Sequence, residues 1–293
     1  MTSEEGFIEL DQASTALMIR LRSRFRGALL GLALGEALAA PTVLRRAGSF
    51  APVRDLLGGG AFDLPRGAWG DDTAMAICLA HSLLECNACD PVDQLRRYRS
   101  WQCDGEYSAT GECLGITAGV SRALADGAPD ITVADGSELL ARTAPLSAFY
   151  LADDQGLLLS VETTARVTHH DCSGIEVAQT FASLMQSALR GAAVPQLCVR
   201  FESASGLQSS AGRMLARVMQ AFCATTQWKH AVLDVINDGG DSDVAGAVCG
   251  QLAGACYGVE GLPVAWLNAL HGREQLEGLA DRMLAAVLLG EQT

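Results

Sequence analysis

Residues 26–38 carry a glycine at every fourth position: Arg26-Gly27-Ala28-Leu29-Leu30-Gly31-Leu32-Ala33-Leu34-Gly35-Glu36-Ala37-Leu38. Positions four apart lie on one face of an α-helix, so this stretch predicts a helix with a glycine stripe. A second stripe with the same spacing occurs near the C-terminal end, at Gly246, Gly250, Gly254 and Gly258. Glycine inside a helix costs roughly 1 kcal/mol relative to alanine. The two stripes therefore indicate close backbone approach, and we expect the two helices to pack on each other.

Two acidic clusters stand where a turn runs into a helical pattern: Trp69-Gly70-Asp71-Asp72 and Gly239-Gly240-Asp241-Ser242-Asp243. Acidic side chains are favoured at helix N-termini, because unpaired N–H groups and the helix dipole present positive charge there. On that interpretation the clusters are two helix starts that never meet. If they converge, their four carboxylates need cations between them. The predicted ligands of one or two Mg²⁺ (or Mn²⁺) ions are then Asp71, Asp72, Asp241 and Asp243.

The composition favours a helical protein with a large core. Of the 293 residues, 49% are hydrophobic, 19% are charged and only 5% are aromatic, which is typical of closely packed helices and not of a β-sandwich. We predict an all-α fold, with residues 1–20 as an N-terminal leader and residues 21–293 as one domain. The segment Leu197 to Phe201 is the one modest strand candidate. Helices are predicted at 73–85, 95–103, 157–166, 174–189, 212–225 and 228–236.

Charge and targeting signals exclude several classes of protein. A formal net charge of −13 leaves no basic stripe for nucleic acid. The longest apolar helical pattern, 27–40, is too short for a membrane span and contains Glu36. The acidic N-terminus lacks the features of a signal peptide, so we expect a cytoplasmic protein. The ten cysteines are then expected to be reduced thiols, several of them packed in apolar helices.

Five motifs, in order along residues 22–290, resemble those of the ADP-ribosylglycohydrolase family, which includes dinitrogenase reductase-activating glycohydrolases and ADP-ribosyl-acceptor hydrolases. They are 26–38, Trp69-Gly70-Asp71-Asp72-Thr73-Ala74-Met75, Gly136-Ser137 with Arg142-Thr143-Ala144-Pro145, Thr168-His169, and 237–250. The resemblance implies a single orthogonal helical bundle. It also implies metal ligands at Asp71, Asp72, Asp241 and Asp243, catalytic roles for Asp71, Asp72 and Asp243, and ADP-ribose contacts from Gly111, Gly136, Ser137 and His169.

The chain departs from the family motifs at several positions that the resemblance assigns to the metal site. Gly70 and Val244 stand where a threonine ligand is implied, and Val43 stands at about the position of a glutamate that takes part in many members. Gly115 replaces an aspartate, and the motif Gly-Asp of the first helix reads Gly35-Glu36. Four acidic ligands are kept, while the hydroxyl ligands and one carboxylate are lost.

The resemblance implies a metal-dependent hydrolase that removes ADP-ribose from a modified protein side chain or a small acceptor. The metals would hold the ribose hydroxyls and lower the pKa of a bound water, which Asp71 or Asp243 would orient or deprotonate. One alternative is a catalytically impaired relative that acts as an ADP-ribose- or protein-binding module of regulatory or immunity type. A purely structural use of the helical fold is the third. The expected partner is ADP-ribose or an ADP-ribosylated protein, with no nucleic acid and no membrane; the sequence does not determine an oligomeric state.

Overall fold

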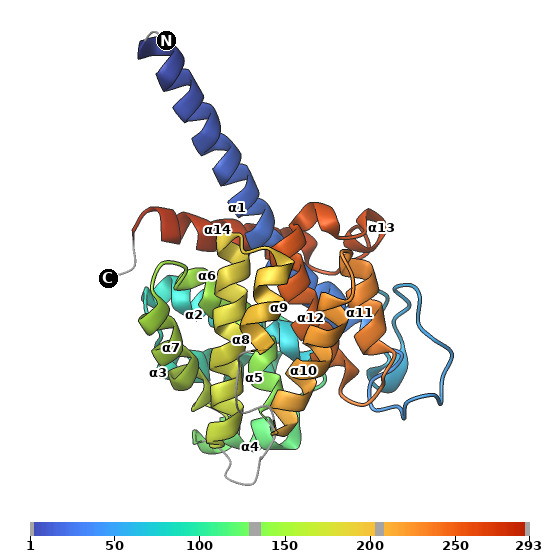
Figure 1. The fold of residues 1–293 in the computed structure, drawn as a ribbon. Coiled ribbons are helices and arrows are strands. Elements are labelled where there is room, and N and C mark those ends of the chain that lie inside the picture. The colour runs from blue at the N-terminus through green and yellow to red at the C-terminus, as the bar shows by residue number, and fades with distance from the viewer. Residues whose placement is uncertain (1–2, 129–135, 203–207, 291–293) are drawn as a thin grey trace.

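The computed structural model describes residues 3–128, 136–202 and 208–290, which form an all-helical bundle (Figure 1). Within these ranges there is no β-sheet, only isolated bridges between Val43 and Gly240 and between Gly59 and Leu64. The helices are α1 Ser3–Ala39, η1 Gly60–Phe62, α2 Asp71–Cys86, α3 Pro91–Asp104, α4 Ala118–Asp126, α5 Ser137–Ala141, α6 Thr143–Phe149, α7 Asp154–Ala165, α8 Cys172–Arg190, α9 Val194–Glu202, α10 Ser210–Cys223, α11 Trp228–Ile236, α12 Ser242–Tyr257, η2 Val259–Gly261, α13 Val264–Leu267 and α14 Arg273–Leu288.

The two glycine stripes pack against each other, as the sequence predicts. A Cβ on Gly31 would lie 2.2 Å from the carbonyl oxygen of Gly250, and one on Gly35 would lie 2.0 Å from that of Gly246. Gly27 meets Gly254 in the same way, so α1 and α12 run antiparallel with their backbones in contact. This register has a functional consequence, because it brings the end of α1 beside the start of α12.

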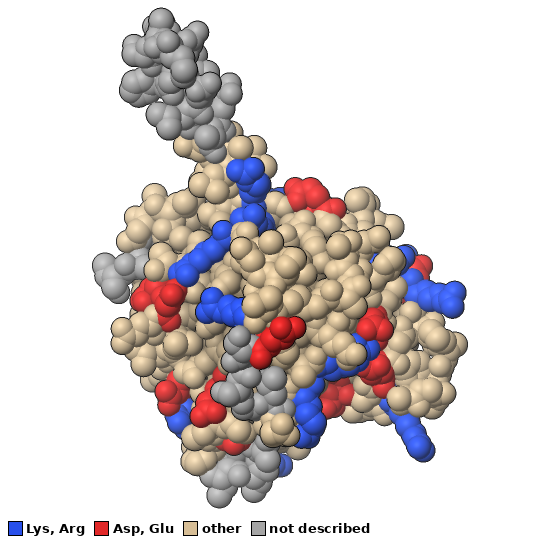
Figure 2. All heavy atoms as spheres, viewed as in Figure 1, with Lys and Arg blue, Asp and Glu red and all other residues tan. Residues whose placement is uncertain are grey.

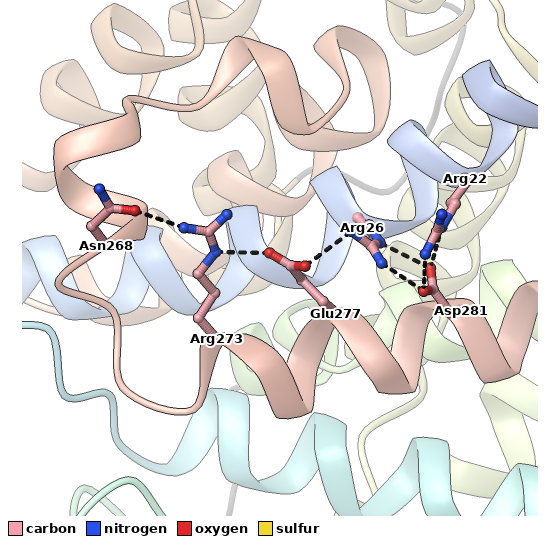
Figure 3. A network of polar contacts seen from close by, with 6 residues as sticks. All are labelled: Arg22, Arg26, Asn268, Arg273, Glu277 and Asp281. Carbon is pink, nitrogen blue, oxygen red and sulfur yellow. Dashed lines mark hydrogen bonds and ion pairs between the residues drawn. The ribbon is translucent and has the colours of Figure 1, made fainter.

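The first turns of α1 project beyond the body of the molecule (Figure 1). The helix is continuous across residue 20, so the boundary expected there between leader and domain lies inside one helix. Where α1 enters the body, ion pairs hold it against α14 (Figure 3). Arg22 and Arg26 both contact Asp281, with closest N–O distances of 2.6 Å, and Arg26 also binds Glu277 at 2.9 Å. These contacts join the first long helix to the last one along the chain.

Two expectations about the segment around Cys198 are wrong. Leu197 to Phe201 is not a strand but part of α9, because Val194, Leu197, Cys198 and Phe201 have helical spacing and pack together against the core. Cys198 forms a disulfide with Cys223 at the end of α10, whereas we expected reduced thiols throughout. The other eight cysteines are free.

Basic and acidic side chains are mixed on one face of the molecule (Figure 2). On the face drawn in Figure 2, the coloured basic side chains form small groups interspersed with acidic ones. No helix in the described ranges combines the length and the apolar character that a membrane crossing requires.

Candidate active site

Glu36, near the end of α1, caps the N-terminus of α2. Its carboxylate accepts hydrogen bonds from the backbone N–H groups of Gly70 (2.8 Å), Asp72 (3.2 Å) and Thr73 (2.9 Å), and from the Thr73 hydroxyl (2.5 Å). These are the groups that an α-helix cannot satisfy internally. The capping role therefore falls to a residue 35 positions upstream of Asp71, and the side chains of Asp71 and Asp72 are not needed for it.

At the start of α12, the side chain of Asp243 accepts a hydrogen bond from the backbone N–H of Val244 at 3.0 Å. Asp241 is the N-cap residue by position, but its side chain makes no capping hydrogen bond. The chain around Val43 pairs with the turn before α12, where Leu44 N–H donates to Gly240 O at 2.8 Å. Helix capping by their own side chains therefore does not account for all four aspartates.

The two acidic helix starts face a common cavity of about 520 Å³. Its acidic wall consists of Asp71 from α2, Glu138 from α5, and Asp241 and Asp243 at the start of α12. Its apolar wall includes Val43, Leu44, Phe62, Ile116 and Val244. The structure thus brings together three of the four predicted aspartates in one cavity wall. Asp72, the fourth, is buried behind Asp71 at 3% exposure.

The carboxyl groups of this region share negative charge in a buried setting. Burial raises the pKa of Asp71 well above its ordinary value, and the charges of Glu36, Asp243 and Glu138 raise it further. Burial and the charge of Asp71 do the same to Asp72, whose Oδ2 atom is buried without a hydrogen-bond partner among the described residues. Burial raises the pKa of Asp243 to about 6. A positive group bound between these carboxylates would relieve their repulsion.

The residues expected to bind ADP-ribose fall in different places. Ser137 lines the cavity. Gly136, its neighbour, packs against Gly174 of α8, where a Cβ would come within 2.6 Å of the Gly174 Cα. Gly111 is an exposed residue with φ of 83° and is not part of the cavity lining. His169 is fully buried behind the wall, with its Nδ1 2.8 Å from the Thr168 hydroxyl.

Comparison with known proteins identifies the family. A family model described as ADP-ribosylglycohydrolase matches residues 18–292, nearly the whole chain. The chain belongs to the ADP-ribosylglycohydrolase family. The solved structure of an "ADP-ribosylglycohydrolase-related protein complex" is similar in fold, with a TM-score of 0.80, 34% sequence identity, and coverage of 91% of this chain and 98% of that one.

Curated relatives of this ADP-ribosylglycohydrolase family member include enzymes with two different targets. The chain is 30% identical to the ADP-ribosylarginine hydrolase Tri1 of Pseudomonas putida, over 89% of this chain and 77% of the relative. It is 27% identical to the ADP-ribosyl-[dinitrogen reductase] glycohydrolase of Rhodospirillum rubrum, over 88% of this chain and 93% of the relative. Both relatives are named as hydrolases of ADP-ribosyl linkages, which supports hydrolytic removal of ADP-ribose as the reaction class.

Three of the positions where this member departs from the family motifs lie at the cavity. Val43, Val244 and Gly115 all line it, and none offers a side-chain oxygen. Gly115 has φ of 91°, and a Cβ there would lie 2.2 Å from Asp71 Oδ1. Glycine at 115 therefore leaves the space in which the Asp71 carboxylate sits. Gly70 has φ of −109° and ψ of −132°, and a Cβ there would lie 3.0 Å from Glu36 Oε1.

Sequence reasoning missed two acidic residues of this ADP-ribosylglycohydrolase site. Glu36 appears in the sequence only as a departure from a Gly-Asp motif, and its capping of α2 depends on tertiary contact. Glu138 lines the cavity from the first turn of α5. The acidic residue directly after Gly136-Ser137 was the signal available in the sequence.

The donor chemistry fits a divalent cation. Carboxylate oxygens suit Mg²⁺ or Mn²⁺, the cavity lining as described contains no Lys or Arg, and Asp72 Oδ2 is buried without a partner among the described residues. Within the described ranges, no three His, Cys, Asp or Glu side chains are gathered closely enough to hold one ion together. Water molecules would therefore have to supply a large part of the coordination.

Proposed function

We propose that this chain is a metal-dependent hydrolase that cleaves the N-glycosidic bond between ADP-ribose and an arginine side chain of a modified protein. The observation that carries the proposal is the cavity wall formed by Asp71, Glu138, Asp241 and Asp243. The choice of arginine linkage is supported by the ADP-ribosylarginine hydrolases among the relatives, at 30% and 29% identity.

Electrostatics make a cation necessary for this substrate. ADP-ribose carries a negatively charged pyrophosphate, and an acidic wall repels it unless a cation lies between them. We propose that Asp71, Asp72, Asp241 and Asp243 hold one or two Mg²⁺ or Mn²⁺ ions. When bound, such an ion lowers the pKa of a water ligand and stabilises negative charge on oxygen.

The residues of the wall have separate tasks in this mechanism. Asp71 or Asp243 accepts the proton of the attacking water, because both carboxylates line the cavity. Departure of the leaving group builds positive charge on the ribose ring, which the remaining carboxylates stabilise. The apolar wall at Phe62 and Ile116 excludes bulk water and strengthens these charge interactions.

The proposal is tested by incubating the protein with an arginine-ADP-ribosylated protein and measuring released ADP-ribose, with Mg²⁺, with Mn²⁺ and with a chelator. We expect release that requires the cation and that falls by at least about 100-fold in Asp71→Asn and in Asp243→Asn, because a positioned general base typically contributes that much. A parallel reaction with serine-linked ADP-ribose tests the linkage. Wild-type protein that releases no ADP-ribose from either substrate would refute hydrolysis.

A second candidate function is binding of ADP-ribose without turnover. It is favoured by the apolar side chains of Val43 and Val244, which line the cavity where the family resemblance implies oxygen ligands. Calorimetry separates the two functions. Tight ADP-ribose binding by a protein that leaves both linkages intact would identify a binding module, whereas turnover identifies a hydrolase.

A further inference from the structure

A chain of polar contacts leads from the buried interior to the cavity wall. Arg142, between α5 and α6, is 2% exposed, and its Nη2 donates to the Thr168 hydroxyl at 2.9 Å. The Thr168 oxygen lies 2.8 Å from His169 Nδ1. His169 Nε2 in turn lies 3.8 Å from Glu138 Oε2, the carboxylate that lines the cavity.

The order of donors along this chain follows from chemistry. A guanidinium can only donate, so Thr168 accepts from Arg142 and has a single hydroxyl proton left. We assign that proton to the contact with His169 Nδ1, because a neutral His169 that donated from Nδ1 would turn the lone pair of Nε2 toward the Glu138 carboxylate. A neutral imidazole that accepts at Nδ1 carries its proton on Nε2. The Nε2–H group therefore faces Glu138, and His169 presents a positive dipole to the Glu138 carboxylate.

Burial separates the residues that support this arrangement from the one that reaches the cavity. Thr168 and His169 are both fully buried, so neither contacts a molecule in the cavity directly. Arg142 is a buried cation, and in the described part of the chain its Nε and Nη1 atoms have no hydrogen-bond partner. A buried positive charge favours a negative charge nearby. Glu138, with a side chain 17% exposed, lies at the point where the chain of contacts reaches the cavity.

We propose that Glu138 is a further acidic group of the cation site beside Asp71, and that Arg142, Thr168 and His169 are positioning residues that hold its carboxylate toward the cavity. The proposal rests on the proposed function, because it presumes that the acidic wall binds a divalent cation. It gives the Thr-His pair a supporting role behind the wall instead of direct contact with ADP-ribose. It also adds a carboxylate to a cavity whose apolar lining residues offer no ligand.

The test is a calorimetric titration of Mn²⁺ alone into the metal-free protein. Because it measures binding, no catalytic activity is needed. We expect Glu138→Gln to weaken Mn²⁺ binding by about 10-fold or more, and Thr168→Val to weaken it by about 10-fold, as removal of supporting groups around metal ligands commonly does. Thr168→Ser keeps the hydroxyl and should bind Mn²⁺ like the wild type. Glu176→Gln, an exposed residue of α8, is the charge-matched control and should also bind like the wild type.

The double variant separates positioning from a general structural effect. If Thr168 acts through Glu138, adding Thr168→Val to Glu138→Gln causes no further loss of affinity; an additional full loss would refute the relay. Glu138 lies at the cavity wall, so Glu138→Gln tests whether this carboxylate belongs to the cation site even if Thr168→Val fails to fold. Unchanged Mn²⁺ affinity in Glu138→Gln, with a wild type that binds, would overturn this inference and leave the proposed function standing. A wild type that binds no Mn²⁺ would overturn both.

Discussion

The carboxylate of Glu36 in α1 accepts hydrogen bonds from both the backbone N–H and the hydroxyl of Thr73 in α2. This contact joins the end of the glycine-striped helix to the start of the helix that carries Asp71 and Asp72. It explains how a residue outside the aspartate pairs determines where those aspartates lie.

Replacement of Glu36 by Gln should destabilise the protein. The amide has one acceptor oxygen and places an NH₂ group against N–H donors, so at least one buried donor loses its partner. We expect the free energy of unfolding to fall by about 2 kcal/mol, which urea denaturation monitored by circular dichroism would measure. The exposed Glu176→Gln variant provides the baseline. Equal stability of the two variants would show that the cap is dispensable.

In the presence of a chelator, the free energy of unfolding should fall as pH rises from about 4.5 to about 7. Burial raises the pKa of Glu36 from 4.5 to about 7 and that of Asp243 from 3.8 to about 6. In this window the unfolded chain has released these protons while the folded chain keeps them, so folding becomes less favourable with increasing pH. Thermal unfolding across this range checks the trend. We expect Mg²⁺ to reduce the slope; a stability that rises with pH throughout the window would contradict the assignment.

The glycine contact between α1 and α12 should tolerate no side chain. Gly31→Ala places a methyl group 2.2 Å from the Gly250 carbonyl oxygen, and we expect a loss of about 2 kcal/mol or more through overpacking. Gly278 in α14 is the matched control, because a Cβ there meets nothing within 4 Å. Gly278→Ala should raise stability by about 0.5–1 kcal/mol, since alanine is the better helix former. Similar effects of the two substitutions would refute the close packing.

Val244→Thr should strengthen cation binding. The side chains are close in shape, Val244 lines the cavity, and the new hydroxyl adds an oxygen beside Asp243. We expect Mg²⁺ affinity to increase by up to about tenfold, measured by calorimetry. Adding Gly70→Thr is a harsher change, because its Cβ must displace Glu36 Oε1 from 3.0 Å. If wild-type hydrolysis is not improved by either variant, the carboxylates and water already form a sufficient site.

The ion pairs between α1 and α14 should contribute modestly and in a pH-dependent way. Hydrogen bonds from Arg26 and Arg22 lower the pKa of Asp281 below its ordinary value (Figure 3). Their stabilisation is thus present above pH 3.8 and is lost as pH falls. Asp281→Asn should cost about 1 kcal/mol at pH 7, where a chemical denaturation curve would show it, and less at pH 3. A cost that is the same at both pH values would exclude the ionic origin.

Prediction from the sequence succeeded where the signal is local and periodic. The helices at 174–189 and 228–236 correspond to α8 and α11, because their apolar positions repeat with helical spacing. It failed at 197–201, where a five-residue window is too short to distinguish alternation from the helical spacing of Val194 to Phe201. The disulfide between Cys198 and Cys223 could not be predicted, since it depends on how α9 packs on α10.

The sequence by itself determined the helical class, the two glycine stripes, and the aspartate pairs at the starts of two helices. Each of these depends only on residue type and on spacing along the chain. Only the tertiary structure decided that α1 and α12 run antiparallel in a register that brings Glu36, Asp71 and Asp243 to one place. It alone revealed Glu138 at the cavity and His169 behind it. The physical reason is that these relations join residues about 35 to 200 positions apart, and such contacts arise from packing geometry that local spacing does not encode.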